Sequence, residues 1–269
     1  MIFIKILICG YGNIGKHIEK EFEKLSDSLF LYDKYNNLLN DDEVLKQNYD
    51  FAFICVPTEM NADGSANISE VEWIVNRVNA ETIIIKSAVP VGTCEKFGKE
   101  NIVVSPEYYG TTQHSLESPN FAVLGGNKLF TGKTAQLYAN VKDGSFRFIF
   151  TDTKTAELAK YMENCWLAAK VTFCNEFAKI AEGFNVQYEE LRECFIADER
   201  VNPSHTFVYK DKPFYDSHCL NKDIPALLSF CRKNGIKADL MESVNDINAK
   251  RKEERNETTI SFKEECFNE

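Results

Sequence analysis

Residues 10–15 of the chain read Gly10-Tyr11-Gly12-Asn13-Ile14-Gly15, and an apolar run over residues 3–9 comes directly before them. The pattern G-x-G-x-x-G between a buried strand and a helix is typical of a turn that holds a dinucleotide pyrophosphate. The first glycine makes the tight turn, the second lets the backbone approach the phosphates, and the third lets the helix pack on the strand. A helix expected over residues 14–25 would add unpaired N–H groups and the positive end of its dipole. This stretch predicts a dinucleotide-binding α/β fold.

A carboxylate stands where the ribose of such a dinucleotide would lie. A second strand is expected over residues 29–32, and Asp33 ends it, about 20 residues after the glycine turn. A carboxylate at this point accepts hydrogen bonds from a ribose 2′-hydroxyl and repels a 2′-phosphate. The sequence therefore predicts NAD as the cofactor instead of NADP. A glycine-rich turn without a ligand is the alternative, and the strand, the helix and the carboxylate together speak against it.

The first part of the chain alternates strand-like and helix-like segments. Further strands are expected at residues 51–56, 82–86, 102–104, 121–124 and 147–150, and helices at 69–78 and 133–140. Parallel strands need crossover connections, so this alternation predicts a doubly wound, mostly parallel sheet. We expect residues 1–150 to form an N-terminal Rossmann domain.

The pattern changes after residue 150. From Thr153 to Glu182 there is neither Gly nor Pro, which predicts one long helix that Gly183 ends. Shorter helices are expected at residues 189–195, 222–234 and 240–255. Residues 151–250 thus predict an all-helical central domain, followed by a charged tail over 251–269. The long helix is apolar on more than one face, so we expect it to mediate a homodimer.

Composition limits the partners and the compartment. Lys and Arg number 31 against 41 Asp and Glu, which gives a net charge of −10 over 269 residues. This acidic balance without a basic run argues against nucleic acid and anionic membranes as partners. No apolar run approaches the ~20 residues of a membrane span. The nine cysteines form no CxxC pair, and the four histidines make no metal-ligand pattern with them. We therefore expect no metal and a reducing, cytoplasmic setting.

Polar stretches follow three of the expected strands. They read CVPT at residues 55–58, KSAVPVGT at 86–93 and SPEYY at 105–109. Ligands of doubly wound sheets bind at the carboxyl ends of the strands, although each stretch alone also fits ordinary turn chemistry. Further stretches read AELAKYMEN at 156–164, NEFAKIAE at 175–182, RVNPSHTFV at 200–208 and CLNKDIPAL at 219–227. In this order and spacing, with the glycine turn, the chain resembles the UDP-glucose/GDP-mannose dehydrogenases.

The resemblance implies an NAD-dependent nucleotide-sugar dehydrogenase, with UDP-glucose and UDP-glucuronate as the expected substrate and product. Two successive oxidations would pass through a Cys thiohemiacetal and a thioester. Cys219 matches the nucleophile in C-x-x-K-D, just before the expected helix 222–234, where the helix dipole and Lys222 favour a thiolate; a buried structural thiol is the alternative. The catalytic residues implied by the resemblance are Cys219, Lys160, Asn164, Asp223 and Glu107. The implied cofactor contacts are Gly10, Tyr11, Gly12, Asn13, Ile14, Gly15, Asp33, Pro57, Thr58, Ser87 and Lys222. The implied substrate contacts are Glu107, Tyr108, Lys160, Asn164, Arg200 and His205.

The chain also departs from the family pattern. Ala88 stands for the Thr of K-S-T-V-P, which would weaken hydrolysis of the thioester, and Thr111 replaces a second carboxylate. Residues 214–218 replace a glycine-rich approach to the Cys, and Asp216 there is expected to repel both thiolate and phosphate. Asn221 replaces a Pro. The charged tail stands where the family has a second Rossmann-like domain. Three explanations are open: a partner or another subunit supplies the nucleotide grip, the ligand is smaller, or sugar-nucleotide oxidation has been lost. An impaired NAD-binding or interaction module and a simple β-hydroxyacid-type dehydrogenase remain alternatives.

Overall fold

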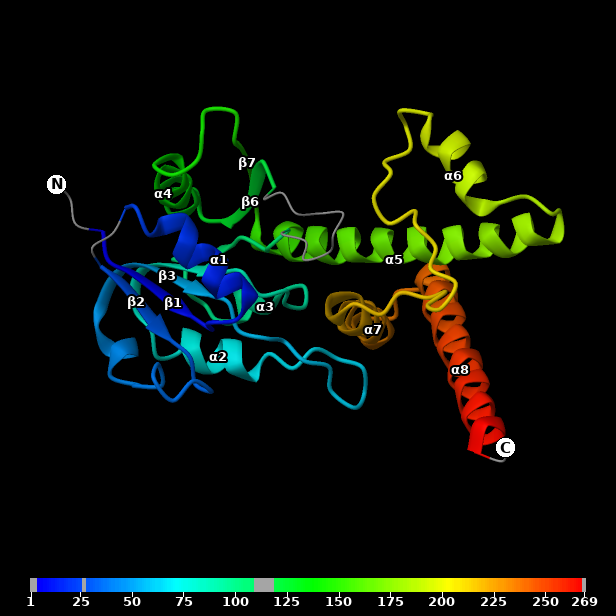
Figure 1. Cartoon of the computed structure of the whole chain (residues 1–269). Coiled ribbons are helices and arrows are strands. Elements are labelled where there is room, and N and C mark those ends of the chain that lie inside the picture. The colour runs from blue at the N-terminus through cyan, green and yellow to red at the C-terminus, as the bar shows by residue number, and fades with distance from the viewer. Residues whose placement is uncertain (1–3, 26–27, 109–118, 268–269) are drawn as a thin grey trace. The chain divides into compact units, whose positions relative to one another are not determined.

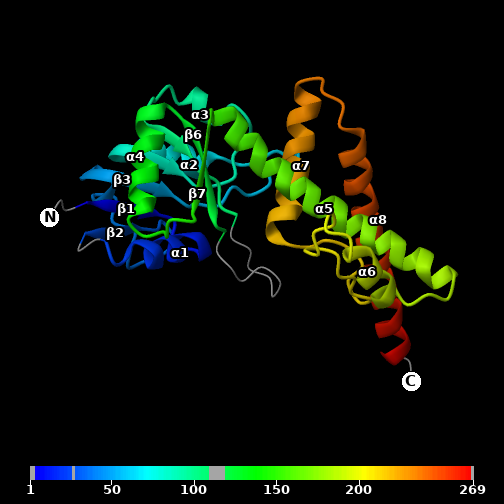
Figure 2. The same cartoon turned by 90° about the horizontal axis from the view of Figure 1, so that it is seen from above.

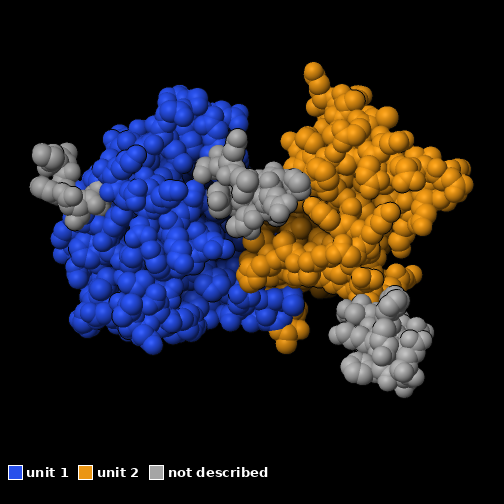
Figure 3. Space-filling view, in the orientation of Figure 1, with its two compact units in different colours: residues 1–61, 66–161 blue, residues 62–65, 162–269 orange. Residues whose placement is uncertain are grey.

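The computed structural model describes residues 4–25, 28–108 and 119–267, with side chains up to Arg255. The chain divides into two compact units (Figure 3). Unit 1 comprises residues 1–61 and 66–161, and unit 2 comprises residues 62–65 and 162–269. Tyr109 and Thr111 lie outside the described residues.

Unit 1 is built on a seven-stranded sheet with the order β2-β1-β3-β4-β5-β6-β7 (Figure 1). The strands are β1 (Ile6–Cys9), β2 (Leu29–Tyr32), β3 (Asn48–Ile54), β4 (Asn79–Ile85), β5 (Ile102–Val104), β6 (Phe121–Gly126) and β7 (Arg147–Thr151). Neighbouring strands run parallel except β5 and β6, which are antiparallel. The central strands are Ile- and Val-rich because both of their faces are buried. The predicted doubly wound, mostly parallel sheet is confirmed.

Helices cover both faces of this sheet. They are α1 (Asn13–Phe22), α2 (Ser69–Val75), α3 (Thr93–Lys96) and α4 (Lys128–Ala139), with a 3₁₀ turn, η1 (Val44–Lys46). Phe22 of α1 and Tyr138 of α4 pack with Phe53 on one face. Ile74 of α2 packs with Ile54 on the other face. The short α3 was not expected from the sequence.

Unit 2 is helical. The long helix α5 (Thr153–Gly183) begins in unit 1 and continues into unit 2, which also holds α6 (Tyr188–Ile196), α7 (His218–Lys233) and α8 (Asp239–Phe267), all labelled in Figures 1 and 2. Ala168, Ile224 and Val244 bring α5, α7 and α8 together in one apolar core. The all-helical part that follows the sheet is confirmed. No helix in the described ranges is long and apolar enough to cross a membrane.

Several helix boundaries differ from the predictions; α4, for example, begins at Lys128 and not at residue 133, because Asn127 caps it by accepting from the Leu129 N–H. Two further differences bear on the candidate site. The helix expected at 222–234 begins at His218, because the hydroxyl of Ser217 caps it by accepting from the Leu220 N–H at 3.3 Å. Cys219 therefore lies inside the first turn of α7 and not before the helix. The last helix was expected at 240–255, but α8 continues to Phe267. Arg251, the first residue of the expected charged tail, is buried in α8 and donates to the Thr172 carbonyl of α5 at 3.1 Å.

Candidate active site

The turn between β1 and α1 depends on two glycines that a side chain could not replace. Gly10 has a φ of +91°, and a Cβ there would lie 2.8 Å from the carbonyl carbon of Cys55. A Cβ on Gly15 would lie 2.0 Å from the Gly10 carbonyl oxygen. A Cβ on Gly12 would meet nothing within 4 Å, and Gly12 caps α1 without a side-chain hydrogen bond. The backbone at the start of α1 is therefore open at Gly12, as the approach of a pyrophosphate requires.

Asp33 is fixed against this turn. Its carboxylate accepts from the Tyr11 N–H at 2.7 Å and from the Tyr35 N–H at 2.9 Å. The neighbouring cation, Lys34, forms an ion pair with Glu70 at 3.0 Å. Both observations suit a ribose with a free 2′-hydroxyl, because the carboxylate is held in place and the adjacent Lys already has an anionic partner.

The ends of β3 and β4 are tied to each other. The buried Thr58 hydroxyl donates to the Ala88 carbonyl at 2.8 Å, and the buried Ser87 hydroxyl donates to the Val56 carbonyl at 2.6 Å. Pro57 lies exposed between Val56 and Thr58. Both hydroxyls therefore hold together the loops at the carboxyl edge of the sheet, and the predicted contact of Thr58 and Ser87 with the cofactor stays a prediction.

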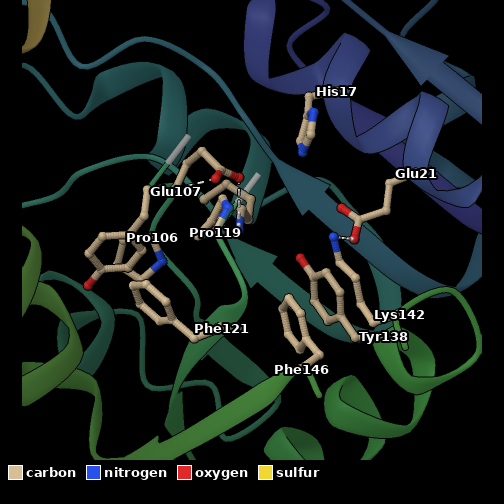
Figure 4. A pocket seen from close by; sticks show the side chains of 12 residues that line it. His17, Glu21, Pro106, Glu107, Pro119, Phe121, Tyr138, Lys142 and Phe146 are labelled. Atoms are coloured by element: carbon tan, nitrogen blue, oxygen red, sulfur yellow. Dashed lines mark hydrogen bonds and ion pairs between the residues drawn. The ribbon is translucent and has the colours of Figure 1, made fainter. Parts of the chain in front are cut away.

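A buried ion pair lies beside this edge. Lys86 Nζ is 3.2 Å from Glu107 Oε2, and these side chains are only 5% and 10% exposed. Figure 4 shows the small pocket beside them, with Glu107 across from Glu21 and Lys142, which form a second ion pair at 2.5 Å. The predicted carboxylate Glu107 is therefore held by a cation that the sequence analysis did not assign to the site.

The charge of Lys86 is maintained by its neighbours. Burial by itself lowers the pKa of Lys86. The neighbouring Glu107, Tyr138 and Cys55 together raise it by more than burial lowers it, so the pKa lies above the usual lysine value. Burial raises the pKa of the Tyr138 phenol, which is also buried in this cluster. At neutral pH the cluster therefore holds a charged Lys86 beside a neutral Tyr138.

Lys160 and Tyr108 meet in unit 1. The Lys160 ammonium lies 4.8 Å from the centre of the Tyr108 ring, a cation–π distance. The Tyr108 N–H in turn donates to Glu107 Oε1 at 2.9 Å. The structure thus brings three predicted residues, Glu107, Tyr108 and Lys160, into one connected group.

A second group lies in unit 2 between α5 and α7. Asn164 Nδ2 donates to Asp223 Oδ2 at 2.6 Å, and Lys222 Nζ contacts Asp223 Oδ1 at 2.6 Å. Asn164 and Asp223 are 3% and 2% exposed. Asp223 thus has a partner on each oxygen, which is how a buried carboxylate remains stable. Asn164 follows Lys160 by one turn of α5, with the boundary between the units falling between them.

The predicted nucleophile is accessible. Among the cysteines that the structure describes, Cys194 and Cys219 are exposed and the others are buried. Cys219 stands one helical turn before Asp223 on α7. Its exposure contradicts the alternative of a buried structural thiol.

Asp216, which is expected to repel thiolate and phosphate, has cationic partners in the structure, and the repulsion itself stays a prediction. Asp216 forms ion pairs with Lys212 and Lys252, both at 3.0 Å. Asn221 also donates to Asp216 Oδ1 at 2.8 Å. These partners hold the pKa of Asp216 well below its usual range, the Asn221 hydrogen bond being the largest cause, and they neutralise its charge locally.

Arg200 and His205 lie on the segment between α6 and α7. The Arg200 guanidinium binds Asp198 at 2.5 Å, and its side chain is 89% exposed. His205 has a φ of 61° and its Nδ1 lies 3.3 Å from the Ser204 hydroxyl. The predicted role of both residues in substrate binding remains a prediction.

Two models of one protein family match the chain in sequence. The NAD binding domain of the UDP-glucose/GDP-mannose dehydrogenase family matches residues 12–142, and the central domain of the same family matches residues 154–250. The chain belongs to this family. The predicted resemblance is confirmed, and NAD is the cofactor that the matched N-terminal domain binds in the UDP-glucose/GDP-mannose dehydrogenases.

Curated relatives of the chain are named as UDP-glucose 6-dehydrogenases. One from Rickettsia bellii is 29% identical, covering 81% of this chain and 52% of the relative. One from Pseudomonas aeruginosa is 28% identical, covering 75% and 49%. The chain spans about half the length of these relatives.

Solved structures show the same fold at lower identity. A UDP-glucose dehydrogenase from Pyrobaculum islandicum superimposes with a TM-score of 0.77 at 21% identity, covering 92% of this chain and 68% of that one. A 3-hydroxyisobutyrate dehydrogenase from Mycobacterium tuberculosis gives 0.68 at 15% identity and covers 93% and 94%. The fold of this UDP-glucose/GDP-mannose dehydrogenase family member is thus shared with a simpler kind of dehydrogenase, and specific residues must decide between their chemistries.

Three residues, Lys86, Asn248 and Lys252, contact the predicted site residues or the segment before Cys219 and were not predicted from the sequence. Lys86 opens the KSAVPVGT stretch, and a lone Lys at the end of an otherwise apolar strand was the available signal. Asn248 and Lys252 of α8 contact the segment before Cys219. Nothing in the local sequence around residues 248–252 points to that contact.

Proposed function

We propose that the chain oxidises the primary alcohol of a nucleotide sugar with NAD⁺, with UDP-glucose as the substrate and UDP-glucuronate as the product. The observation that carries the proposal is the exposed Cys219 on α7, one turn before a buried Asp223 that binds Asn164 and Lys222. A single oxidation of a secondary alcohol needs no thiol, whereas oxidation of an alcohol to an acid gains from covalent capture of the aldehyde.

The proposed reaction has balanced steps. The dinucleotide, held by the glycine turn and Asp33, would supply the hydride acceptor for both oxidations. In the first, the alcohol carbon loses a hydride, the hydroxyl proton goes to a carboxylate, and an aldehyde results. The Cys219 thiolate adds to the carbonyl carbon, forming a C–S bond. In the second oxidation this adduct loses its hydride, for which a second NAD⁺ would be the acceptor, and the Cys219 thioester remains. Water then replaces sulfur, giving a carboxylate and a free thiol, so each sugar yields two NADH.

The roles of the polar side chains follow from their hydrogen bonds. Asn164 uses one amide hydrogen on Asp223 and keeps a second, which can stabilise the oxyanion formed when sulfur adds. Lys160 supplies a positive charge toward the substrate, a role that the family resemblance implies. Asp223 and Glu107, both held by Lys partners, accept the protons that the steps release.

An NAD-binding module without turnover is the second candidate. Ala88 favours it, because the hydroxyl that a Thr would offer at the end of β4 is missing, and the Ala88 carbonyl is taken by Thr58. Such a module would bind NAD⁺ through Gly12 and Asp33 but would not complete the hydrolysis of a thioester.

The test measures NADH formation by the full chain with UDP-glucose and a panel of UDP- and GDP-sugars. We expect two NADH per sugar, loss of uronate formation in Cys219→Ala, and full activity in Cys194→Ala, the matched exposed cysteine. NAD⁺ binding without NADH from any sugar would reject the proposal in favour of the second candidate. Activity that is indifferent to Cys219→Ala would favour a simple hydroxyacid-type reaction.

We also propose that unit 2 forms a homodimer through α5. Its exposed apolar side chains recur at helical spacing along one stripe, namely Met162, Trp166, Phe173, Phe177 and Ile180, with exposures between 39% and 74%. An exposed apolar stripe of this length is typical of an interface, and a second copy offers the same stripe in return. Light scattering should give the dimer mass for the wild type and for the exposed-face control Lys179→Glu. A monomeric wild type, or a dimer that survives Trp166→Glu with Phe173→Glu, would reject this proposal.

A further inference from the structure

The segment before the proposed nucleophile is held by the last helix. Asn248 of α8 binds both backbone groups of Tyr215: its Oδ1 accepts from the Tyr215 N–H at 2.9 Å, and its Nδ2 donates to the Tyr215 carbonyl at 3.2 Å. Both residues are 5% exposed. A buried amide that pairs with both backbone groups of one residue fixes that residue in one conformation.

A second set of contacts forms a closed triangle of side chains. Lys252 Nζ lies 3.0 Å from Asp216 Oδ1 and donates to Asn221 Oδ1 at 2.7 Å. Asn221 Nδ2 completes the triangle by donating to Asp216 Oδ1 at 2.8 Å. Each member binds the other two, so displacing one breaks two contacts.

The residues that α8 contacts lie on both sides of Cys219 in the sequence. Asp216 precedes the Ser217 cap and Asn221 follows in the first turn of α7, with Cys219 between them. Asn248 and Lys252 are one turn apart on α8 and so lie on one face of that helix. The Tyr215 backbone before the thiol and the Asn221 side chain after it are therefore bound to one face of α8.

We propose that Asn248 and Lys252 are positioning residues that hold Cys219 in the first turn of α7 for attack on the substrate. This inference rests on the proposed function of Cys219 as the nucleophile. The side chains of Asp216 and Lys252 are 39% and 28% exposed, so the triangle contributes to stability only modestly, whereas a small displacement of a nucleophile has a large effect on rate.

The test compares Lys252→Met, which keeps the aliphatic stem, with Lys252→Arg and with Lys250→Met. Lys250 is the matched control, because it lies on α8 with 77% exposure. For oxidation of the nucleotide sugar we expect kcat to fall about tenfold in Lys252→Met, with an unchanged KM for NAD⁺, and to recover in Lys252→Arg. Asn248→Ala should lower kcat at least as much; if it fails to fold, the Lys252 series decides.

A second measurement does not depend on turnover. Alkylation by iodoacetamide is followed at Cys219 relative to Cys194 on the same chain, both being exposed. Loss of the clamp, meaning the contacts of Asn248 and Lys252 with residues 215–221, frees the first turn of α7. We therefore expect the ratio of alkylation at Cys219 to that at Cys194 to change about threefold in Lys252→Met and to stay unchanged in Lys250→Met. If the wild-type chain forms no NADH with any nucleotide sugar, the proposed function fails. The alkylation ratio alone then tests whether Asn248 and Lys252 hold Cys219 in place. If Lys252→Met equals Lys250→Met in alkylation, or changes only KM in an active enzyme, the positioning role is overturned.

Discussion

At the scale of single residues, Gly10 and Gly12 lie in one turn but are needed for different reasons, Gly10 for the fold and Gly12 for the space that the cofactor would occupy. Gly10 combines a left-handed φ with a Cβ position 2.8 Å from the backbone of Cys55, whereas the space around Gly12 is open. We predict that Gly10→Ala lowers the free energy of unfolding by about 2 kcal/mol or more, from backbone strain and overpacking. Urea denaturation followed by circular dichroism measures this.

Gly12→Ala supplies the matched comparison. We expect its free energy of unfolding to stay within about 0.5 kcal/mol of the wild type. The added methyl should weaken NAD⁺ binding about tenfold or more in calorimetry, because it occupies the space that the pyrophosphate needs. An undisturbed affinity would place the dinucleotide elsewhere.

Lys86 and Glu107 make a second prediction at this scale. Lys86→Met removes one charged partner of the buried Glu107 carboxylate, which costs about 3 kcal/mol of unfolding free energy at pH 7. The folded-state pKa of Lys86 is raised, so its contribution is fully present below the usual lysine pKa of about 10.4 and is lost as pH rises through the folded value. The difference between wild type and Lys86→Met should therefore be constant from pH 7 to about pH 10 and shrink above it. A difference that already shrinks between pH 7 and about 9 would contradict this account.

At the scale of elements, α5 holds the short helix α3 through one carboxylate. Glu157 is 1% exposed and accepts from the Gly92 N–H at 2.5 Å and the Cys94 N–H at 2.9 Å. Glu157→Gln places an NH₂ group against one of these donors, so we predict a loss of about 1–3 kcal/mol. Thermal unfolding of this variant should be compared with Glu182→Gln on the exposed face of the same helix. Equal midpoints would show that the carboxylate does not support α3.

The elements that the sequence predicted best are those with a local signal. Apolar runs gave the strands, and the stretch without Gly or Pro gave α5. The start of α7 was predicted too late, because its signal is a single cap, Ser217, and polar residues follow it. The antiparallel pairing of β5 with β6 has no local signal, since direction depends on the path of the whole chain.

At the scale of the whole molecule, part of the candidate site has a local sequence signal and part of it depends on contacts between distant residues. The glycine turn and Asp33 could be read from spacing alone. The bond between Asn164 and Asp223 joins residues 59 positions apart, and that between Tyr215 and Asn248 joins residues 33 apart. Such contacts form only when the chain packs. The family resemblance predicted Asn164 and Asp223 as site residues, whereas Asn248 lies in no family motif and could not be predicted.

Cofactor binding should also stabilise the chain as a whole. A ligand that binds only the folded state adds about 2.7 kcal/mol at a hundredfold excess over its Kd. We predict that NAD⁺ raises the melting temperature and that NADP⁺ at equal concentration does so far less, because Asp33 repels a 2′-phosphate. Equal shifts with both dinucleotides would show that Asp33 does not select the cofactor.

The clamp on Cys219 also has a consequence for synthesis. Translation places Cys219 in the growing chain before Asn248 and Lys252, so the proposed nucleophile emerges from the ribosome ahead of the residues that hold it. Chains stalled before Asn248 should therefore carry the thiol without its alignment, and alkylation of stalled chains tests this. If the clamp acts as proposed, the reactive group becomes competent only when α8 has folded, so the onset of chemistry waits for a helix that is synthesised after the nucleophile.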